Sequence, residues 1–507
     1  MILPDQSIDG KSSFMNFASE NNFKFLDYND YEIVDKTYQT IKGRRQYSID
    51  GKTVDIGNID KKEKIAKIIE TISCSSENTI VYCGRKSDTE SYAKALLQKP
   101  GLLSLFNENC ELYTPEIYHL FLEHLENTFG NDWIVLNALK GRIGIHHSLI
   151  PKYIQKEIIS LFNHGALVCL FSTTTITEGV NTTAKNVIIT SNKKGIKQLR
   201  QFDAKNIAGR AGRFNQHYIG RVIDLDNKFE DIIHGNEETI KHKNYDILSI
   251  KTDVDYQITK DRYLSHQDLT EKNNILNKLI QMQIPSSVYN AFRIVGLKDK
   301  MQLFDRIRHI DPLKEKLIND IAFNLARSNA RRFNWDGFQI VIDIILPIVH
   351  EEKLKKLIVT KIGEKQTYSL ITALLHYYLS DGFHSMVDYY SEKTNKDTAI
   401  RIVADYVYNV FKYHLVKYLG VFDIFYRFFI SQKINRLIDD IPGMGLLLQK
   451  LEYNALTPNA RRLSDYGVPF NIVRHYDTDQ PSPIKNFDKY EQSIDADIQR
   501  LLIRYNT

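Results

Sequence analysis

Short apolar runs alternate with helical patterns along residues 78–225, and this alternation limits the possible fold more than any other feature. The runs are Thr79–Cys83, Leu167–Phe171, Asn186–Thr190 and Ile219–Ile223. Helical patterns lie at about 88–98, 114–128, 151–163 and 203–211. Strands that alternate with helices form a parallel sheet, whose functional loops follow the C-terminal ends of the strands. The sequence therefore predicts an α/β domain.

Two blocks of different character flank this domain. Residues 1–75 are polar, with signals for a strand at Tyr31–Val34, a β-hairpin at Arg45–Ile56 around Asp50-Gly51, and a helix at Lys61–Ile72. From about 270 to 470, aromatic-rich helical periods dominate, for example at Ile400–Leu419. We therefore expect an inter-domain linker at 1–75, the α/β domain at 76–228, a mostly α-helical region at 229–470 and a loosely packed tail at 471–507.

The charge of the chain is small on average and concentrated locally. A net charge of +5 over 507 residues does not by itself indicate a nucleic-acid partner. Residues 191–221, however, contain eight basic residues and a single acidic residue, Asp203. The basic residues are Lys193, Lys194, Lys197, Arg200, Lys205, Arg210, Arg213 and Arg221. Such a basic stripe suits the phosphates of ATP or of a nucleic acid.

The remaining composition points to a soluble protein. The chain has no apolar stretch of membrane-spanning length and no secretory signal at its start. Its four cysteines form no CxxC pair, which indicates neither a disulfide framework nor a zinc site. We therefore expect a cytoplasmic protein with no membrane partner and no bound structural metal.

Four motifs occur in a fixed order within the α/β region. They are the strand-plus-helix Ile80–Leu97, the segment Gly144-Ile145-His146-His147, the hydroxyl-rich run Ser172–Thr175 leading to Gly179-Val180-Asn181, and Asn206–Arg213. In this order and spacing they resemble the second RecA-like domain of a superfamily 2 helicase of the DExH, Ski-two-like branch. Taken in the order given above, the four segments look like motif IV, the segment with two histidines, motif V and motif VI. Asn206 stands where motif VI usually has Gln.

The resemblance implies a fold of the P-loop NTPase helicase C-terminal type and roles for the motif residues. Arg210 and Arg213, three residues apart on an expected helix start, would act as arginine fingers on a transferring phosphoryl group, with Asn206 beside them. The residues that contact the nucleotide would include Gly179, Asn181, Gly209 and Gly212. The nucleic-acid contacts would be Ser172, Thr173, Thr174, Thr175, Gly84 and Arg85.

Simpler interpretations of the same residues stay open. An Arg pair on a surface often forms salt bridges, and a run of Ser and Thr often caps the next helix. His146 and His147 lack a carboxylate at metal-ligand spacing, so a packing or domain-closure role fits them better.

The helical region contains one further motif, Ile441-Pro442-Gly443-Met444-Gly445, between expected helices at 433–440 and 446–453. It resembles the hairpin of a helix-hairpin-helix, whose backbone amides around Gly443 and Gly445 would bind a phosphate. An ordinary interhelical turn is the alternative. Helicases of this branch carry a helical ratchet domain across the exiting strand, a role that the region 229–470 could fill.

The ATP-binding motifs of a first RecA-like domain are missing from the sequence. No DExH string occurs, and the two GK[ST] triplets, Gly10-Lys11-Ser12 and Gly51-Lys52-Thr53, have Asp5 and Gln46 where a Walker A glycine is needed. The resemblance therefore implies that ATP and Mg²⁺ are bound mainly by a missing or separate first domain, in a truncated or split enzyme.

The leading interpretation is the C-terminal portion of an ATP-dependent helicase that acts on DNA, with RNA possible. The first alternative is a non-catalytic nucleic-acid-binding or regulatory protein derived from a helicase. The second is a stand-alone P-loop enzyme that uses Lys11 or Lys52, which the context of both triplets argues against.

Overall fold

The computed structural model describes residues 2–3, 26–27, 34–41, 46–49, 51–57, 59–73, 77–177, 182, 184–212, 219–235, 252–326, 333–363, 367–477 and 487–506. The chain divides into two compact units. Unit 1 comprises Met1–Lys241, Tyr466–Ile472 and Pro483–Thr507, and unit 2 comprises His242–Asp465 and Val473–Ser482. These limits differ from the predicted ones because both the N-terminal block and the C-terminal tail belong to unit 1.

Unit 1 is built on a six-stranded sheet in the order β3-β12-β9-β6-β8-β7, with every neighbouring pair parallel. The strands are β3 (Asp35–Thr40), β6 (Thr79–Tyr82), β7 (Ile143–His146), β8 (Cys169–Ser172), β9 (Asn186–Ile189) and β12 (Ile219–Asp224). All residues of β6, β7, β8 and β9 are buried, as expected of parallel strands covered on both faces. The predicted parallel α/β domain is confirmed.

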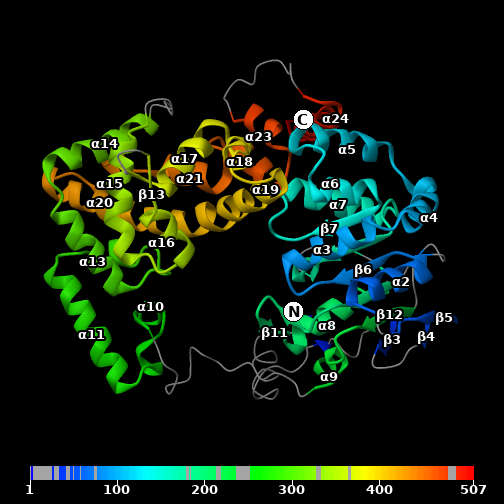
Figure 1. Cartoon of the computed structure of the whole chain (residues 1–507). Coiled ribbons are helices and arrows are strands. Elements are labelled where there is room, and N and C mark those ends of the chain that lie inside the picture. The colour runs from blue at the N-terminus through cyan, green and yellow to red at the C-terminus, as the bar shows by residue number, and fades with distance from the viewer. Residues whose placement is uncertain are drawn as a thin grey trace. The chain divides into compact units, whose positions relative to one another are not determined.

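Helices flank this sheet (Figure 1). They are α2 (Lys61–Ser73), α3 (Lys86–Leu97), α4 (Pro100–Cys110), α5 (Glu116–Phe129), α6 (Ile134–Lys140), α7 (Lys152–Asn163), α8 (Gln201–Ala208) and α9 (Phe229–Ile233). Strand β7 and helices α4 and α6 were not predicted. Gly144 and His146 interrupt the apolar pattern of β7, so it does not look like a buried strand in the sequence.

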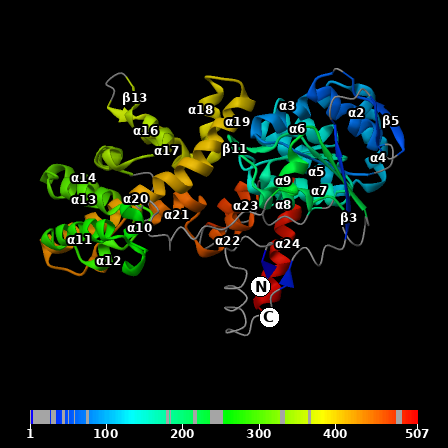
Figure 2. The same cartoon turned by 90° about the horizontal axis from the view of Figure 1, so that it is seen from below.

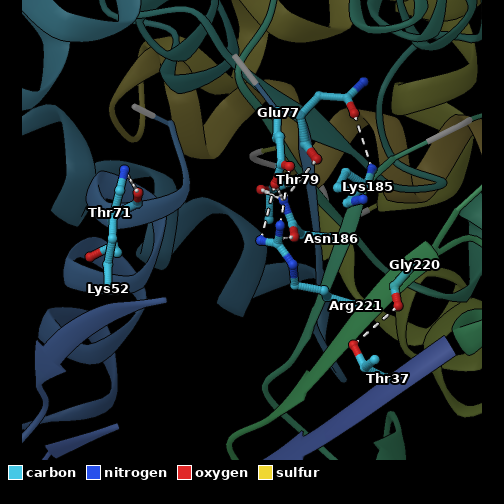
Figure 3. Close-up of polar contacts among 10 residues, drawn as sticks. Thr37, Lys52, Thr71, Glu77, Thr79, Lys185, Asn186, Gly220 and Arg221 are labelled. Carbon is cyan, nitrogen blue, oxygen red and sulfur yellow. Dashed lines mark hydrogen bonds and ion pairs between the residues drawn. The ribbon is translucent and has the colours of Figure 1, made fainter. Parts of the chain in front are cut away.

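The N-terminal block is part of the sheet rather than a linker. Strand β3 pairs with β12, and the hydroxyl of Thr37 lies 3.3 Å from the carbonyl oxygen of Gly220 (Figure 3). The predicted hairpin is confirmed as β4 (Gln46–Ile49) and β5 (Lys52–Asp55), joined at Gly51 with φ of +73°. The strand signal at Tyr31–Val34 is displaced, because the strand begins at Asp35 and residues 31–33 lie outside the described part of the chain.

The predicted helix at Lys61–Ile72 is confirmed as α2, which buries its apolar side chains Ile65, Ile68, Ile69 and Ile72. The Nζ of Lys52 donates to the carbonyl oxygen of Thr71 in the last turn of α2 (Figure 3). Because Gly51 lies in an antiparallel hairpin turn, the triplet at Gly51 does not form a phosphate-binding loop. The other triplet, with Lys11, lies outside the described residues.

The C-terminal tail docks on unit 1 through an 18-residue helix, α24 (Lys489–Asn506), which lies beside α5 in Figure 1. The ring of Tyr490, 2% exposed, lies 5.1 Å from that of Phe121 on α5. His124 Nδ1 lies 2.6 Å from Asp488 Oδ2. The expectation of a loosely packed tail is therefore wrong from residue 487 onwards; residues 478–486 lie outside the described part.

Unit 2 is mostly helical, as predicted, with one small antiparallel ladder between β13 (Lys361–Ile362) and β14 (Tyr368–Ser369). Its helices are α10 (Asp253–Tyr256), α11 (His266–Gln281), α12 (Ser286–Tyr289), α13 (Leu297–Arg308), α14 (Pro312–Ala326), α15 (Trp335–Ile345), α16 (Glu352–Val359), α17 (Leu370–Asp381), α18 (Phe383–Ser391), α19 (Lys396–Asp405), the π-helix η7 (Tyr406–Leu415), α20 (Val416–Ile434), α21 (Gly445–Tyr453) and α22 (Pro458–Tyr466). Figure 2 shows α18 and α19 side by side within this unit. A further helix, α23 (Phe470–His475), spans a unit boundary.

Among the described residues, no helix is long and apolar enough to cross a membrane. The described cysteines Cys83, Cys110 and Cys169 are free and buried.

Candidate functional site

The C-terminal ends of the sheet strands lie in one row. In the parallel register Tyr82 pairs with Ser172, Ser172 with His146, and Tyr82 with Ile189. Ile189 in turn pairs with Asp224 at the end of β12. The loops that follow these residues therefore share one edge of the sheet, which is where parallel α/β domains place their ligands.

Residues 173–177, which we call the hydroxyl loop, follow β8 and form a 3₁₀ turn over Thr174–Thr177. Thr173 Oγ1 lies 3.3 Å from Thr175 Oγ1, and the hydroxyl of Thr177 donates to the carbonyl oxygen of Thr174 at 2.7 Å. Thr175 and Thr177 are half-buried, so both residues keep part of their surface exposed. The loop thus presents hydroxyl groups at the edge of the sheet.

Ser172 does not take part in this exposed surface. It has no exposed area, and its hydroxyl donates to the carbonyl oxygen of Thr173 at 3.1 Å. The predicted contact between Ser172 and a nucleic acid is therefore not possible in this conformation. Thr173 and Thr174 are 9% and 8% exposed, which leaves Thr175 as the most accessible of the four predicted side chains.

His146 lies beneath the hydroxyl loop at the end of β7. Its Nδ1 is 3.0 Å from Thr175 Oγ1 and 3.3 Å from Ser172 Oγ. Burial, followed by the charge of His147, lowers the pKa of His146 to about 4, so the imidazole is neutral near pH 7. The neighbouring His147 accepts from the amide of Leu149 at 3.3 Å and lies 3.3 Å from Glu90 on α3. Both histidines therefore bond within the protein.

Arg210 joins the turn after α8 to the hydroxyl loop. Its Nη2 donates to the carbonyl oxygen of Thr177 at 2.9 Å. The expected position of Arg210 on a helix start is wrong, because α8 ends at Ala208 and Gly209 and Arg210 form the turn that follows. Asn206 lies in the last turn of α8 and is half-buried.

Gly212 makes a close approach to the sheet of its own unit. Its φ is +80°, and a Cβ there would lie 2.4 Å from Val34 Cγ1 and 3.0 Å from the amide nitrogen of Gly220. Its own amide donates to the carbonyl oxygen of Ala184 at 2.7 Å. Only glycine tolerates this conformation and this crowding. Gly212 thus packs against the sheet of its own unit, and its predicted contact with a nucleotide stays a prediction.

Residues 193–198 form an exposed hairpin of β10 (Lys193–Lys194) and β11 (Lys197–Gln198), which we call the basic hairpin. Its three lysines are exposed, and Ile196 at the turn is 89% exposed. The hydroxyl of Tyr82 donates to the carbonyl oxygen of Lys193, and the amide of Gly195 to that of Gly84, each at 2.8 Å. The basic hairpin is therefore anchored at the C-terminal end of β6.

Gly84 supports the basic hairpin instead of contacting a ligand. A Cβ on Gly84 would lie 2.7 Å from Ser191 Oγ and 2.8 Å from the carbonyl oxygen of Lys193. Gly84 is buried, so its predicted contact with a nucleic acid is not supported. The next residue, Arg85, is exposed immediately before α3 and stays a candidate.

Comparison with known proteins identifies the domain that carries these loops. Residues 116–215 match the family model described as the helicase conserved C-terminal domain. Similar proteins include anti-bacteriophage protein B of Escherichia coli (32% identity over 184 residues, 36% of this chain), exosome RNA helicase MTR4 of Mus musculus (28% over 173, 32%) and ATP-dependent DNA helicase MER3 of Saccharomyces cerevisiae (28% over 193, 35%). The matched region is the C-terminal domain of a superfamily 2 DExH helicase.

The helicase domain has the RecA-like fold that the resemblance predicted. The chain spans only 24%, 16% and 15% of the lengths of these three proteins, so their whole-protein activities are not carried over. Motif V extends through Glu178, Gly179 and Asn181, and motif VI ends at Arg213. These four residues lie outside the described part of the chain, so their predicted roles stay predictions.

One member of the basic stripe has a structural role in the helicase domain. Arg221 lies at the opposite edge of the sheet, where it pairs with Glu77 at 3.0 Å and donates to Asn186 Oδ1 at 3.2 Å (Figure 3). The Arg221 and Glu77 side chains are only 14% and 16% exposed. Arg221 therefore joins the N-terminal ends of β6, β9 and β12. Its assignment to the basic stripe that would face phosphates is wrong.

The glycine turn in unit 2 does not have the geometry of a phosphate-binding hairpin. The amide of Met444, between Gly443 and Gly445, already donates to Asp423 Oδ1 at 2.6 Å. A Cβ on Gly443 would lie 2.7 Å from the same oxygen. A 3₁₀ turn, Ile438–Asp440, stands where the first helix was expected. An anion would meet a carboxylate here, which favours the interhelical-turn interpretation for Gly443 and Gly445.

Proposed function

We propose that this chain supplies the second half of an ATP-driven helicase motor. In this proposal Arg210 and Arg213 reach toward a γ-phosphoryl group held by a first RecA-like domain that carries Walker A and DExH motifs. That domain is encoded either in the same polypeptide or in another. The observation that carries the proposal is the bond from Arg210 to Thr177, which couples motif VI to motif V at the functional edge of the sheet.

The described residues fit one part of an ATP–Mg²⁺ site. A guanidinium such as that of Arg210 can stabilise charge on a transferring phosphoryl group. Among the described residues, two carboxylates at this edge already accept backbone amides: Asp224 from Asp226 and Phe229, and Asp226 from Asn192. We therefore expect the metal ligands, and most of the nucleotide contacts, to come from the first domain.

The nucleic-acid contacts in this proposal come from two surfaces of unit 1. The hydroxyl loop offers Thr175 and Thr177 to phosphate oxygens, which hydroxyls and backbone amides commonly bind. The basic hairpin adds three exposed lysines. Arg200 is exposed shortly after it in sequence, and the exposed Arg85 follows Gly84, whose carbonyl oxygen accepts from the Gly195 amide. Because these groups would bind phosphate, they do not distinguish DNA from RNA.

The motor cycle follows from the position of Arg210. When the two RecA-like domains close, the Arg210 guanidinium would exchange the Thr177 carbonyl for phosphate oxygens. The exchange frees the Thr177 carbonyl oxygen, and so links the state of the nucleotide to the hydroxyl loop. ATP supplies the phosphoryl group and its charge; this chain supplies the cation and the strand contacts.

The test is a reconstitution with a first RecA-like domain taken from the same genomic locus or from a relative. We expect little ATP hydrolysis by this chain alone, strand binding by this chain alone, and strand-stimulated hydrolysis by the mixture. Robust hydrolysis by the chain alone would contradict the proposal. Strand binding without any stimulation by added first domains would favour the non-catalytic nucleic-acid-binding protein.

The biological setting is a separate proposal. The name of the Escherichia coli relative connects that protein with bacteriophage defence. We propose the same setting for this chain, to be tested by comparing plaque formation on cells with and without it. Equal plaque numbers over a broad phage panel would contradict this setting without affecting the proposed chemistry.

A further inference from the structure

We infer that His146 is a positioning residue that holds the hydroxyl loop in place through its Nδ1 atom. The inference rests on the proposed function, because the loop is there assigned to strand binding. His146 itself is 2% exposed and so reaches neither a strand nor a nucleotide. It would act through Thr175, whose hydroxyl lies 3.0 Å from the imidazole.

The polar contacts of the loop converge on this imidazole. Thr173 Oγ1 contacts Thr175 Oγ1 at 3.3 Å, and Thr175 Oγ1 contacts His146 Nδ1. The amide of Thr173 also donates to the His146 carbonyl oxygen at 3.4 Å. His146 thus links the loop hydroxyls to the sheet by both its side chain and its backbone.

The support beneath the loop is rigid. His146 ends β7, whose four residues are all buried, and it pairs with Ser172 on the neighbouring strand β8. A side chain fixed on a buried strand positions a partner more precisely than one on a loop. Because the same short turn ends at Thr177, the imidazole also sets the position of the carbonyl that receives Arg210.

The chemistry of the contact requires a nitrogen and not merely a ring. A neutral imidazole offers one donor and one acceptor nitrogen, so Nδ1 can pair with a hydroxyl. A phenyl group of similar size would leave the Thr175 hydroxyl without this partner. The alternative is that His146 only fills space, in which case any side chain of similar volume would serve.

Three substitutions of His146 separate these alternatives. His146→Asn places an amide near the position of Nδ1, His146→Gln places one near Nε2, and His146→Phe keeps the ring without nitrogen. Two quantities are measured for each variant. The first is the affinity of the full chain for a fluorescent oligo-dT and, in a parallel titration, for a fluorescent oligo-U. The second is the melting temperature.

The expected pattern is specific to Nδ1. His146→Phe and His146→Gln should weaken strand binding about tenfold, while His146→Asn should stay within about threefold of the wild type. The matched control is His124→Phe on α5, which removes a buried His124 contact to Asp488 and should lower the melting temperature without changing strand affinity. Equal affinity in all three variants, or losses that only follow the melting temperature, would overturn the inference.

A second variant and a second measurement keep the test decisive. Thr175→Val should weaken binding at least as much as His146→Phe does, because it removes the proposed strand contact as well as the contact with His146. The double variant should be no weaker than Thr175→Val, because His146 acts only through Thr175. Additive losses would overturn the inference. If the wild type binds no strand, the proposed function fails; amide exchange of residues 173–177 still tests the inference, since it should accelerate in His146→Phe and not in His146→Asn.

Discussion

The guanidinium of Arg210 donates a 2.9 Å hydrogen bond to the carbonyl oxygen of Thr177, and so joins the turn after α8 to the loop after β8. The two segments carry motifs VI and V. A cation held by a neutral carbonyl can be drawn to a stronger acceptor such as a phosphate oxygen. In the proposed function, this contact changes when a nucleotide arrives.

The basic hairpin should provide a measurable share of the electrostatic binding. Replacing Lys193 and Lys197 together by Ala is expected to weaken strand binding several-fold. The slope of log affinity against log salt should fall by about 1.4, because each neutralised phosphate on a single strand contributes about 0.7. Titrations at four salt concentrations measure both quantities.

The control for this prediction uses two lysines elsewhere in unit 1. Lys94 and Lys140 lie in the last turns of α3 and α6, and their joint replacement removes the same charge. If this control pair changed the salt slope as much as the hairpin pair, the assigned surface would be wrong.

Gly212 should be intolerant of any side chain. Gly212→Ala introduces a Cβ at positive φ, 2.4 Å from Val34, so we expect a loss of about 2–3 kcal/mol of unfolding free energy. Gly209→Ala is the matched control, because φ at Gly209 is −60°. Denaturant unfolding compares the two variants, and equal stability would show that the backbone at Gly212 differs from the structure.

Arg221 should matter for folding and not for strand binding. Removing it takes away the ion-pair partner of Glu77 and a donor to Asn186 Oδ1 in a largely buried site, at a cost of about 2 kcal/mol. Arg221→Met should therefore lower the melting temperature and leave the salt slope of strand binding unchanged. A reduced salt slope of strand binding at full stability would instead show that Arg221 contacts a phosphate.

The stability of unit 1 should depend on pH through His146. The pKa of His146 is lowered to about 4 from an ordinary value of 6.5, so the unfolded chain binds this proton more readily than the folded one. Stability from this group is complete above pH 6.5 and is lost as pH falls toward 4. Between pH 7.5 and 5, the loss should be about 2 kcal/mol.

His146→Asn isolates this contribution, because it removes the titrating group and keeps a polar contact. Its unfolding free energy should fall less steeply over the same pH range, as measured by urea unfolding at each pH. Parallel profiles for variant and wild type would show that His146 is not responsible.

Sequence patterns predicted the centre of the α/β domain because its strands are short, apolar and covered on both faces. They missed β7, where Gly144 and His146 break the apolar pattern, and they placed β3 in a linker because an edge strand is only half covered. The docking of α24 was missed because it depends on a long-range contact between Tyr490 and Phe121. Local periodicity carries no information about such pairs.

The candidate site was predicted in its residue types more than in its geometry. Motif order pointed to Arg210 and Thr175, both of which lie at the functional edge of the sheet. It could not show that Ser172 is fully buried, that Gly84 supports a hairpin, or that Arg221 pairs with Glu77 at the opposite edge. Each of these depends on the packing of residues distant in sequence. The basic hairpin had one signal, the lysines around Gly195, which was interpreted only as charge.

In the proposed function, Arg210 acts on the nucleotide and not on the strand. The direct measurement is strand-stimulated ATP hydrolysis by the reconstituted enzyme with Arg210→Ala, beside the strand affinity of the same variant. We predict a loss of about a thousandfold in turnover, typical of an arginine finger, with strand affinity within about threefold of the wild type. Unchanged turnover, or a loss of strand binding at full turnover, would contradict it.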